Sequence, residues 1–121
     1  MSGAARVSLR AFNVVVVPRH EWPWARVGAS MREEAIPLDI TLVTTQTHVY
    51  RDIVDSLVEA LRRGDHLARI ETMRVGGRLW IIDGHHRLVA YRALGYAVPS
   101  VRYGPGHDTP RPPKLFARRR V

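Results

Sequence analysis

The residues of this chain best suited to chemistry stand next to one another at 83–87, in the order Asp-Gly-His-His-Arg. An apolar run at 79–82 precedes them, and an apolar pattern with helical spacing follows them. This pattern predicts a strand, a tight turn and a helix. Because the N–H groups and the dipole at the start of a helix attract anions, we interpret the turn as a phosphate-binding site.

Asp83 and Gly84 each have a functional and a structural interpretation. Asp83 is the first polar residue after the buried run, so its carboxylate can cap the helix or hold a metal ion, and its position favours the cap. Gly84 allows a positive φ and the close approach of a ligand, but a tight turn alone also explains it. Neither residue identifies a site by itself.

The three residues that follow carry charge or can acquire it. His85 and His86 are adjacent and therefore point in different directions, which predicts two separate tasks rather than one chelating pair. Arg87 lies in the first helical turn, where a cation is unfavourable unless an anion is close. A bound phosphate would supply that anion, and the alternative is an ion pair with Asp83 or with an acidic residue of the preceding helix.

Apolar spacing and turn residues predict the elements that position this turn. The fold class they indicate is α/β (α+β), a mixed sheet flanked by helices. Thr44 and Thr45 are the expected N-cap of the first helix, and residues 1–12 are expected to be loosely held. In chain order we expect a strand at 13–17, a loop with one helical turn in the charged segment 31–35, an extended segment at 36–43, a helix from Val49 to Gly64, a hairpin at 69–82 turning at Gly76-Gly77, a helix at 86–94 closed by Gly95, and a strand at 97–103.

Length and composition limit the classes of protein that the chain can be. Its 121 residues, 45% of them hydrophobic, predict one globular domain at 1–103 followed by a Pro/Arg-rich tail at 104–121. The absence of cysteine excludes disulfides, thiolate zinc sites and cysteine nucleophiles. The apolar run at 14–17 is too short to span a membrane, and no signal segment precedes it, so we expect a cytoplasmic protein without a membrane partner.

The charge of the chain points to a polyanionic partner. Eighteen arginines and one lysine against 11 acidic residues give a formal net charge of +8. Arginine pairs with phosphate through two parallel hydrogen bonds, so DNA is a plausible partner, and a merely basic surface is the alternative. In the tail, Lys114 and 118–120 (Arg118, Arg119 and Arg120) are candidate nucleic-acid-binding residues or an ordinary solubilising end.

The turn and its surroundings resemble the ParB/sulfiredoxin superfamily. The resemblance covers roughly 36–103, the motif-bearing core, and depends on the turn itself, Ala90, Gly95, the Val-Pro-Ser-Val segment at 98–101, Thr45-Gln46, Val49 and Arg51. It implies that Gly84, His85, His86 and Arg87 bind the phosphates of a nucleotide such as ATP, ADP or CTP. It also implies that Asp83 positions Mg²⁺ or a catalytic water and that His85 and His86 are catalytic candidates.

Departures from the family patterns separate the activities that the resemblance implies. Sulfiredoxins have cysteine in the place of His85, so sulfinic acid repair is excluded. Chromosome-partitioning ParB proteins have glutamate and arginine in the places of His85 and His86 and a later arginine in the place of Val89, so a CTP-dependent clamp is not expected. The free-serine kinases share the turn, but their general-base glutamate aligns with Gln46, which cannot accept a proton.

Short ParB-like proteins of phages, plasmids and toxin systems carry this glutamine and are commonly described as nucleases or nucleotide hydrolases. The leading prediction is therefore a ParB-like nucleotide-binding domain that acts on or with DNA, as an NTPase or nuclease. The alternatives are an ADP- or ATP-dependent small-molecule kinase, if Glu21, Glu34 or Asp39 replaces the missing base, and a non-catalytic DNA-binding module. A homodimer is left open.

Several other residues have weaker signals. Gln46 can face the nucleotide or satisfy a backbone group near the helix start, and Arg51, one turn further along, can reach the same cleft or lie on a solvated face. His48 is expected to be a surface or packing residue. Trp22 and Trp24 can stack on a base, but packing under a loop is the favoured interpretation.

Overall fold

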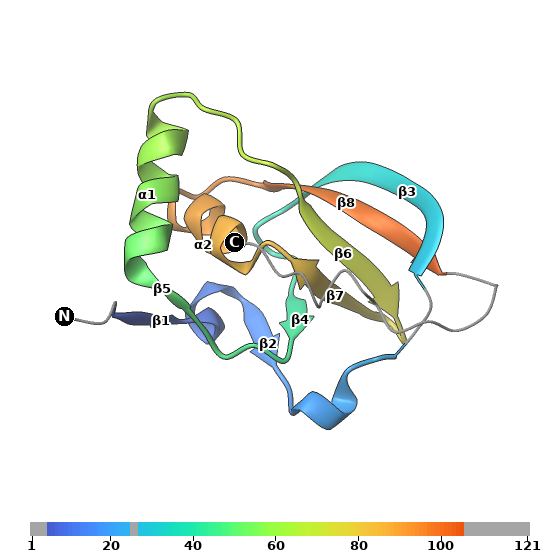
Figure 1. Ribbon diagram of the computed structural model, residues 1–121. Helices are drawn as coiled ribbons and strands as arrows, with labels where there is room; N and C mark the ends of the chain where they lie inside the picture. The colour runs from blue at the N-terminus through green and yellow to red at the C-terminus, as the bar shows by residue number, and fades with distance from the viewer. Residues whose placement is uncertain (1–4, 25–26, 106–121) are drawn as a thin grey trace.

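The computed structural model describes residues 5–24 and 27–105 (Figure 1). These residues form a mixed α+β fold with two helices, which confirms the expected fold class. The helices are α1 (Arg51–Arg62) and α2 (His85–Ala93), and 3₁₀ turns lie at Leu9–Phe12 and Arg19–Glu21. The strands are β1 (Arg6–Ser8), β2 (Val14–Val16), β3 (Val27–Ile36), β4 (Leu42–Thr44), β5 (His48–Tyr50), β6 (Ile70–Val75), β7 (Arg78–Asp83) and β8 (Val98–Pro105).

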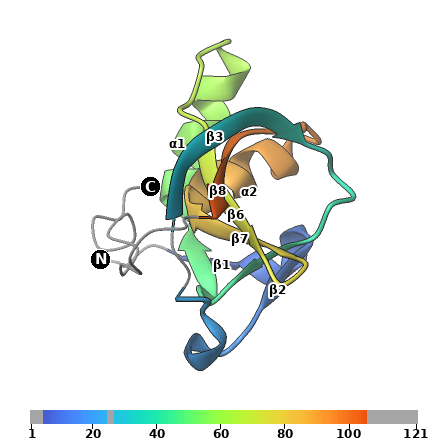
Figure 2. The same ribbon diagram turned by 90° about the vertical axis from the view of Figure 1, so that its right-hand side faces the viewer.

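Six strands form the main sheet, in the order β2-β4-β7-β6-β8-β3. β2, β4 and β7 run parallel to one another, whereas β6 is antiparallel to β7 and parallel to β8. β3 lies at the edge, antiparallel to β8, and arches over the end of the sheet in Figure 2. β1 and β5 pair separately in a small antiparallel sheet.

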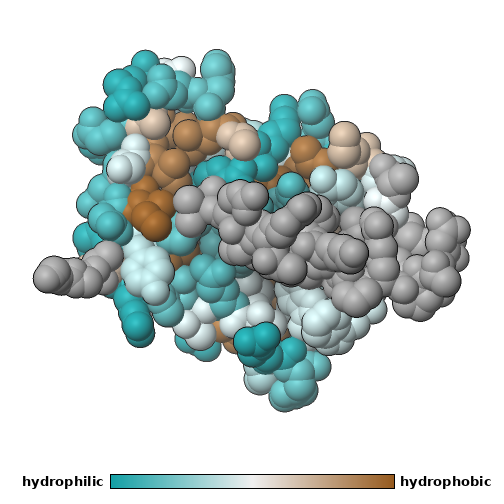
Figure 3. All heavy atoms as spheres, in the orientation of Figure 1, coloured by the Kyte–Doolittle hydropathy of each residue, from teal (hydrophilic) through white to brown (hydrophobic). Residues whose placement is uncertain are grey.

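The main core lies between the helices and one face of the sheet. Leu79 and Ile81 of β7 pack there with Leu88 and Val89 of α2, because alternate residues of a strand share a face. The apolar side chains of α1 gather on the side of the helix nearer α2, and its outer surface is hydrophilic (Figure 3). The opposite face of the sheet carries a smaller cluster around Met73 and Ile82.

The segments with strong local signals fold as predicted. Gly76 and Gly77, with φ of 60° and 78°, form the two-residue turn between the antiparallel strands β6 and β7. Gly64 and Gly95 also adopt positive φ just beyond the ends of α1 and α2. β8 continues to Pro105, two residues past the predicted end at 103.

The prediction of a loop and a helical turn at 31–35 is wrong. This charged segment lies within β3, where residues 31–36 pair one by one with 98–103 of β8. A strand at the edge of a sheet can carry charged side chains on its exposed face, so the polar composition of 31–35 hides its extended structure. The partner strand, more than sixty residues away, supplies the hydrogen bonds that decide the conformation.

The start of α1 also differs from the prediction. β4 ends at Thr44, and the helix begins seven residues later at Arg51, with Tyr50 as its N-cap. The Thr44 hydroxyl accepts a hydrogen bond from the backbone N–H of Gln46. It therefore stabilises the loop after β4 and does not cap a helix. Val49, the expected first helical residue, is a fully buried residue of β5.

The N-terminal segment is held more firmly than expected. Leu9 is fully buried in the main core, and the backbone N–H of Arg51 donates to the carbonyl of Ala5. The segment pairs through β1 with β5, a long-range contact with no local signal.

The tail residues Lys114 and 118–120 lie outside the described residues. Among the residues that the structure describes, neither helix has the length and apolar character needed to cross a bilayer.

Candidate functional site

The predicted turn lies where two parallel strands end at the same edge of the sheet. β4 ends at Thr44 and β7 at Asp83, and α2 begins at His85 directly beyond β7. In sheets of this kind ligands bind outside the carboxyl ends of parallel strands. The topology therefore places the turn in a position suited to a ligand.

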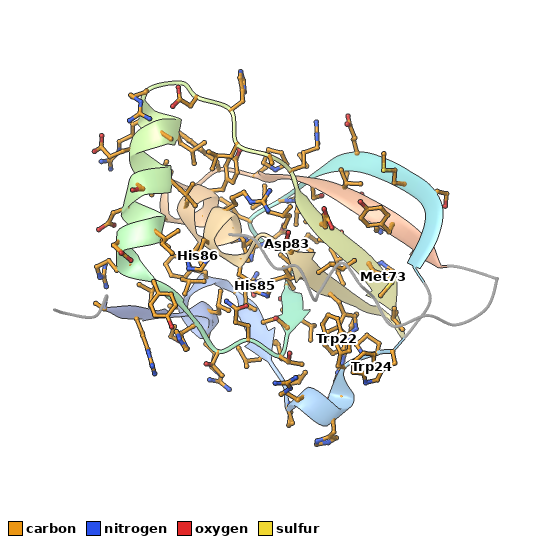
Figure 4. All side chains as sticks on the ribbon, viewed as in Figure 1. Trp22, Trp24, Met73, Asp83, His85 and His86 are labelled. Atoms are coloured by element: carbon orange, nitrogen blue, oxygen red, sulfur yellow. The ribbon has the colours of Figure 1, made fainter. Side chains whose placement is uncertain are left out.

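Five polar side chains are buried together at this edge. Thr44, Asp83, His85, His86 and Arg87 are each at most 9% exposed. Figure 4 shows the labelled Asp83, His85 and His86 near the start of α2. Burying polar groups costs free energy unless they are well paired, and such clusters are common at functional sites.

The geometry of Gly84 is set by its neighbour on β6. Its φ is +102°, and a Cβ added there would lie 2.7 Å from Cγ2 of Ile70. Glycine is therefore required both by the turn and by the close approach of Ile70. Gly84 is also the N-cap of α2, so the expectation that Asp83 caps the helix is wrong by one residue. Asp83 ends β7, and its Oδ1 accepts a hydrogen bond from the N–H of Gly84 at 3.0 Å.

The two histidines contact different parts of the protein, as their adjacency predicts. Nε2 of His85 lies 2.7 Å from the hydroxyl oxygen of Thr44, at the end of β4. Nε2 of His86 accepts a hydrogen bond from the backbone N–H of Tyr50 at 3.0 Å, and the Tyr50 ring stacks on its imidazole with centroids 6.2 Å apart. The two side chains therefore join α2 to β4 and β5.

The environment of His86 favours the neutral imidazole. Burial lowers the pKa of His86 below its ordinary value of 6.5; the nearby carboxylate of Asp52 partly opposes this shift, and His48 adds to it. The hydrogen bond from Tyr50 requires the same state, because Nε2 can accept only when it carries no proton.

Arg87 makes the ion pair that was the alternative to a phosphate. Its Nη2 lies 3.7 Å from Oδ2 of Asp83, and its Nη1 donates to the carbonyls of Ala68 and Arg69, both at 2.9 Å. The guanidinium thus fastens the segment before β6 to the start of α2.

The backbone at the start of α2 has donors that the helix does not use. The N–H of Leu88 donates to the carbonyl of Gly84 at 2.9 Å, and this is the first i to i−4 bond of the helix. The N–H groups of His86 and Arg87 therefore lie before the intrahelical ladder. They are the groups of this turn that most resemble an anion site.

Gln46 and Arg51 lie at the rim of the cluster rather than within it. The side-chain amide of Gln46 donates to the carbonyl of His48 at 2.9 Å. Gln46 therefore satisfies a backbone group, as its structural interpretation predicts, but it does so from a loop and not at the start of a helix. Arg51 is the first residue of α1, and its exposed side chain makes no polar contact with the five buried residues. His48 packs edge-on against the ring of Tyr50.

The three acids considered as replacement bases lie elsewhere. Glu21 pairs with Arg78 at 3.0 Å, and Glu34 of β3 pairs with Arg102 of β8 at 3.4 Å. Asp39 precedes β4, whereas the cluster lies beyond the end of β4. In the described part of the chain, no group of three or more His, Asp or Glu residues is arranged to hold a metal ion.

The tryptophans differ in their surroundings. Trp22 packs edge-on against Trp80, with ring centroids 5.5 Å apart, as the packing interpretation predicts. Trp24 is 69% exposed, so packing under a loop is wrong for this residue. Both lie away from the cluster of Asp83, His85 and His86 (Figure 4).

Sequence reasoning missed the role of Tyr50, whose N–H and ring hold His86. No local pattern marks it, because the contact joins residues 36 positions apart. A comparison with protein-family models, curated proteins and solved structures finds no match to this chain.

Proposed function

We propose that this chain is a ParB-like nucleotide-binding protein that holds the phosphates of ATP, ADP or CTP at the start of α2. The observation that carries the proposal is the group of five buried polar side chains at the shared end of β4 and β7. Burying two histidines, an arginine and an aspartate in one place costs free energy, so such a cluster in a core of this size indicates a functional site. The motif at 83–87, which resembles the family's phosphate cradle, supports the same function.

The residues of the turn have different proposed roles in phosphate binding. The N–H groups of His86 and Arg87 donate to phosphate oxygens, helped by the positive end of the helix dipole. The histidine side chains hold the turn in place through Thr44 and Tyr50. The guanidinium of Arg87, fixed by two carbonyls, adds positive potential near the turn.

Asp83 is the proposed contact for Mg²⁺. Mg²⁺ is usually held by one or two carboxylates together with phosphate oxygens and water, so a single aspartate beside the phosphates fits the ion. The carboxylate is at the end of β7, facing the first turn of α2. Hydrolysis of the nucleotide or of DNA, in the cytoplasm, is the activity that this arrangement would serve.

Titration calorimetry with ATP, ADP, CTP and GTP, with and without Mg²⁺, tests the proposal. We expect one nucleotide class to bind more tightly with Mg²⁺. In Asp83→Asn the Mg²⁺ effect should be lost while binding without Mg²⁺ is kept or improved, because a negative charge near the phosphates is removed. Asp55→Asn removes the same charge at an exposed position on α1 and is the matched control. Equal behaviour of the two variants would contradict the role of Asp83.

Amide NMR shifts locate the site independently of any variant. Binding at the turn should move the N–H resonances of His86 and Arg87 more than those of other residues, because these groups become hydrogen-bond donors. If no nucleotide binds, or if the shifts gather on another part of the sheet, the proposal is wrong.

A further inference from the structure

A hollow lies near the other end of the sheet, where β3, β6 and β8 run side by side. It has a volume of about 430 Å³ and is lined by 30–32 of β3, Arg74 of β6 and 102–104 of β8. Arg74 is next to the hairpin turn, whereas the candidate nucleotide site is beside the start of β6. The two regions are separate, so a ligand at one does not require a nucleotide at the other.

Strand register brings three arginines to the same face of this hollow. Arg32 is paired with Arg102 across β3 and β8, and Arg102 is paired with Thr72 across β8 and β6. Paired residues point to the same side of a sheet, as do residues two apart on one strand, so Arg74 joins the other two. Neighbouring strands are about 4.8 Å apart, so the three guanidinium groups stem from backbone positions spread over about 10 Å.

The protein itself neutralises this charge only in part. Glu34 lies 3.4 Å from Arg102, and Arg74 donates to the carbonyl of Gly77. Arg32 makes no ion pair with any described residue. Like charges directly opposite one another on neighbouring strands destabilise a sheet, so the Arg32–Arg102 pair costs stability unless an anion joins them.

The face of the hollow that carries the arginines is polar. Met31 and Tyr103 also line the hollow, but each is one residue away from Arg32 or Arg102, so their side chains leave the opposite face of the sheet, where Tyr103 packs on Met73 and Ile82. A positively charged groove that follows the phosphate backbone is a feature with which proteins hold single-stranded nucleic acid without reading its sequence. The hollow has the volume of a small-ligand site, which admits one nucleotide unit rather than a duplex.

We propose that this arginine groove binds single-stranded nucleic acid, with consecutive phosphates on Arg32, Arg102 and Arg74. The spread of the three arginines calls for more than one phosphate. The segment after Pro105 carries Arg111, Lys114 and three arginines at 118–120 against one aspartate, so it offers little negative charge to pair with these arginines.

Fluorescence anisotropy with a short labelled oligothymidylate tests this groove in the full chain. We expect Arg32→Ala and Arg74→Ala each to weaken binding about tenfold, as for a lost charge-assisted hydrogen bond. Each should also lower the slope of log affinity against log salt by about 0.7. Arg62→Ala removes the same charge from an exposed position on α1 and should change neither quantity. Thermal melting of all three variants checks that they remain folded.

The outcomes separate this groove from general charge attraction and from the nucleotide site. Amide shifts at 31–32 and 102–104 on adding the oligonucleotide would support the proposal, whether or not a mononucleotide binds at His86 and Arg87. An equal loss in all three variants, or no binding at low salt, would overturn it. It would also be overturned if free ATP or tripolyphosphate bound with the same dependence on Arg32 and Arg74 while the oligonucleotide did not.

Discussion

At the scale of single residues, His86 couples the candidate site to the pH of the solution. Its Nε2 accepts a hydrogen bond from the N–H of Tyr50, the residue that caps α1, and burial lowers its pKa. The unfolded chain, with a histidine pKa near 6.5, therefore takes up a proton more readily than the folded one. Stability from this group is present above that value and is lost as the pH falls through the lower pKa of the folded state.

We predict that the free energy of unfolding falls as the pH is lowered from about 6.5 through the lower pKa of folded His86, and that His86→Gln flattens this fall. Glutamine can still accept from Tyr50 through its amide oxygen but takes up no proton. Urea unfolding at a series of pH values measures the effect. His66→Gln, at an exposed position, is the control and should leave the pH dependence unchanged. A His86→Gln profile parallel to that of the unchanged protein would show that His86 is not the titrating group.

At the scale of elements, the turn between β7 and α2 depends on one close approach. Gly84 and Gly64 both have positive φ, but only Gly84 has a neighbour, Ile70, in the space that a Cβ would fill. We predict that Gly64→Ala costs about 1 kcal/mol, for the backbone conformation alone. Gly84→Ala should cost about 3 kcal/mol or more, because the clash with Ile70 adds to that strain.

Denaturant unfolding of the two glycine variants provides the comparison. Nucleotide titration of Gly84→Ala adds a second readout, since a shifted β6–α2 contact moves the first turn of the helix. Equal costs for Gly64→Ala and Gly84→Ala would mean that the packing of Ile70 yields easily. The turn would then be less rigid than its geometry indicates.

The elements also show which parts of the fold a sequence can reveal. The hairpin at Gly76-Gly77 and the helix, predicted at 86–94 and found at 85–93, could be predicted because their signals are local: turn glycines and helical apolar spacing. β3 was missed because its charged residues gain their conformation from a distant partner, β8. The residues of the candidate site at 83–87 were found for the same reason as the hairpin, but their partners Thr44 and Tyr50 come from other strands and could not be read from spacing.

At the scale of the whole molecule, Arg92 joins segments that are far apart in the sequence. It stands in the last turn of α2, where an arginine usually faces solvent and complements the helix dipole. In the fold it is buried, and burial lowers the pKa of its guanidinium, although the nearby Asp39 opposes the shift. Its Nη atoms donate to four carbonyls, those of Phe12, Asn13, Pro37 and Ile40.

These four bonds connect the N-terminal segment, the loop between β3 and β4, and α2. We predict that Arg92→Ala lowers the free energy of unfolding by about 3 kcal/mol or more, because several carbonyls lose their donors in a buried place. Arg92→Lys should recover only part of this loss, since an ammonium group cannot reach both pairs of carbonyls at once. Urea unfolding measures the cost, with Arg62→Ala as the exposed arginine control. If Arg92→Ala were no more costly than that control, water would be replacing the guanidinium, and the N-terminal segment would be held by the burial of Leu9 and by β1 instead.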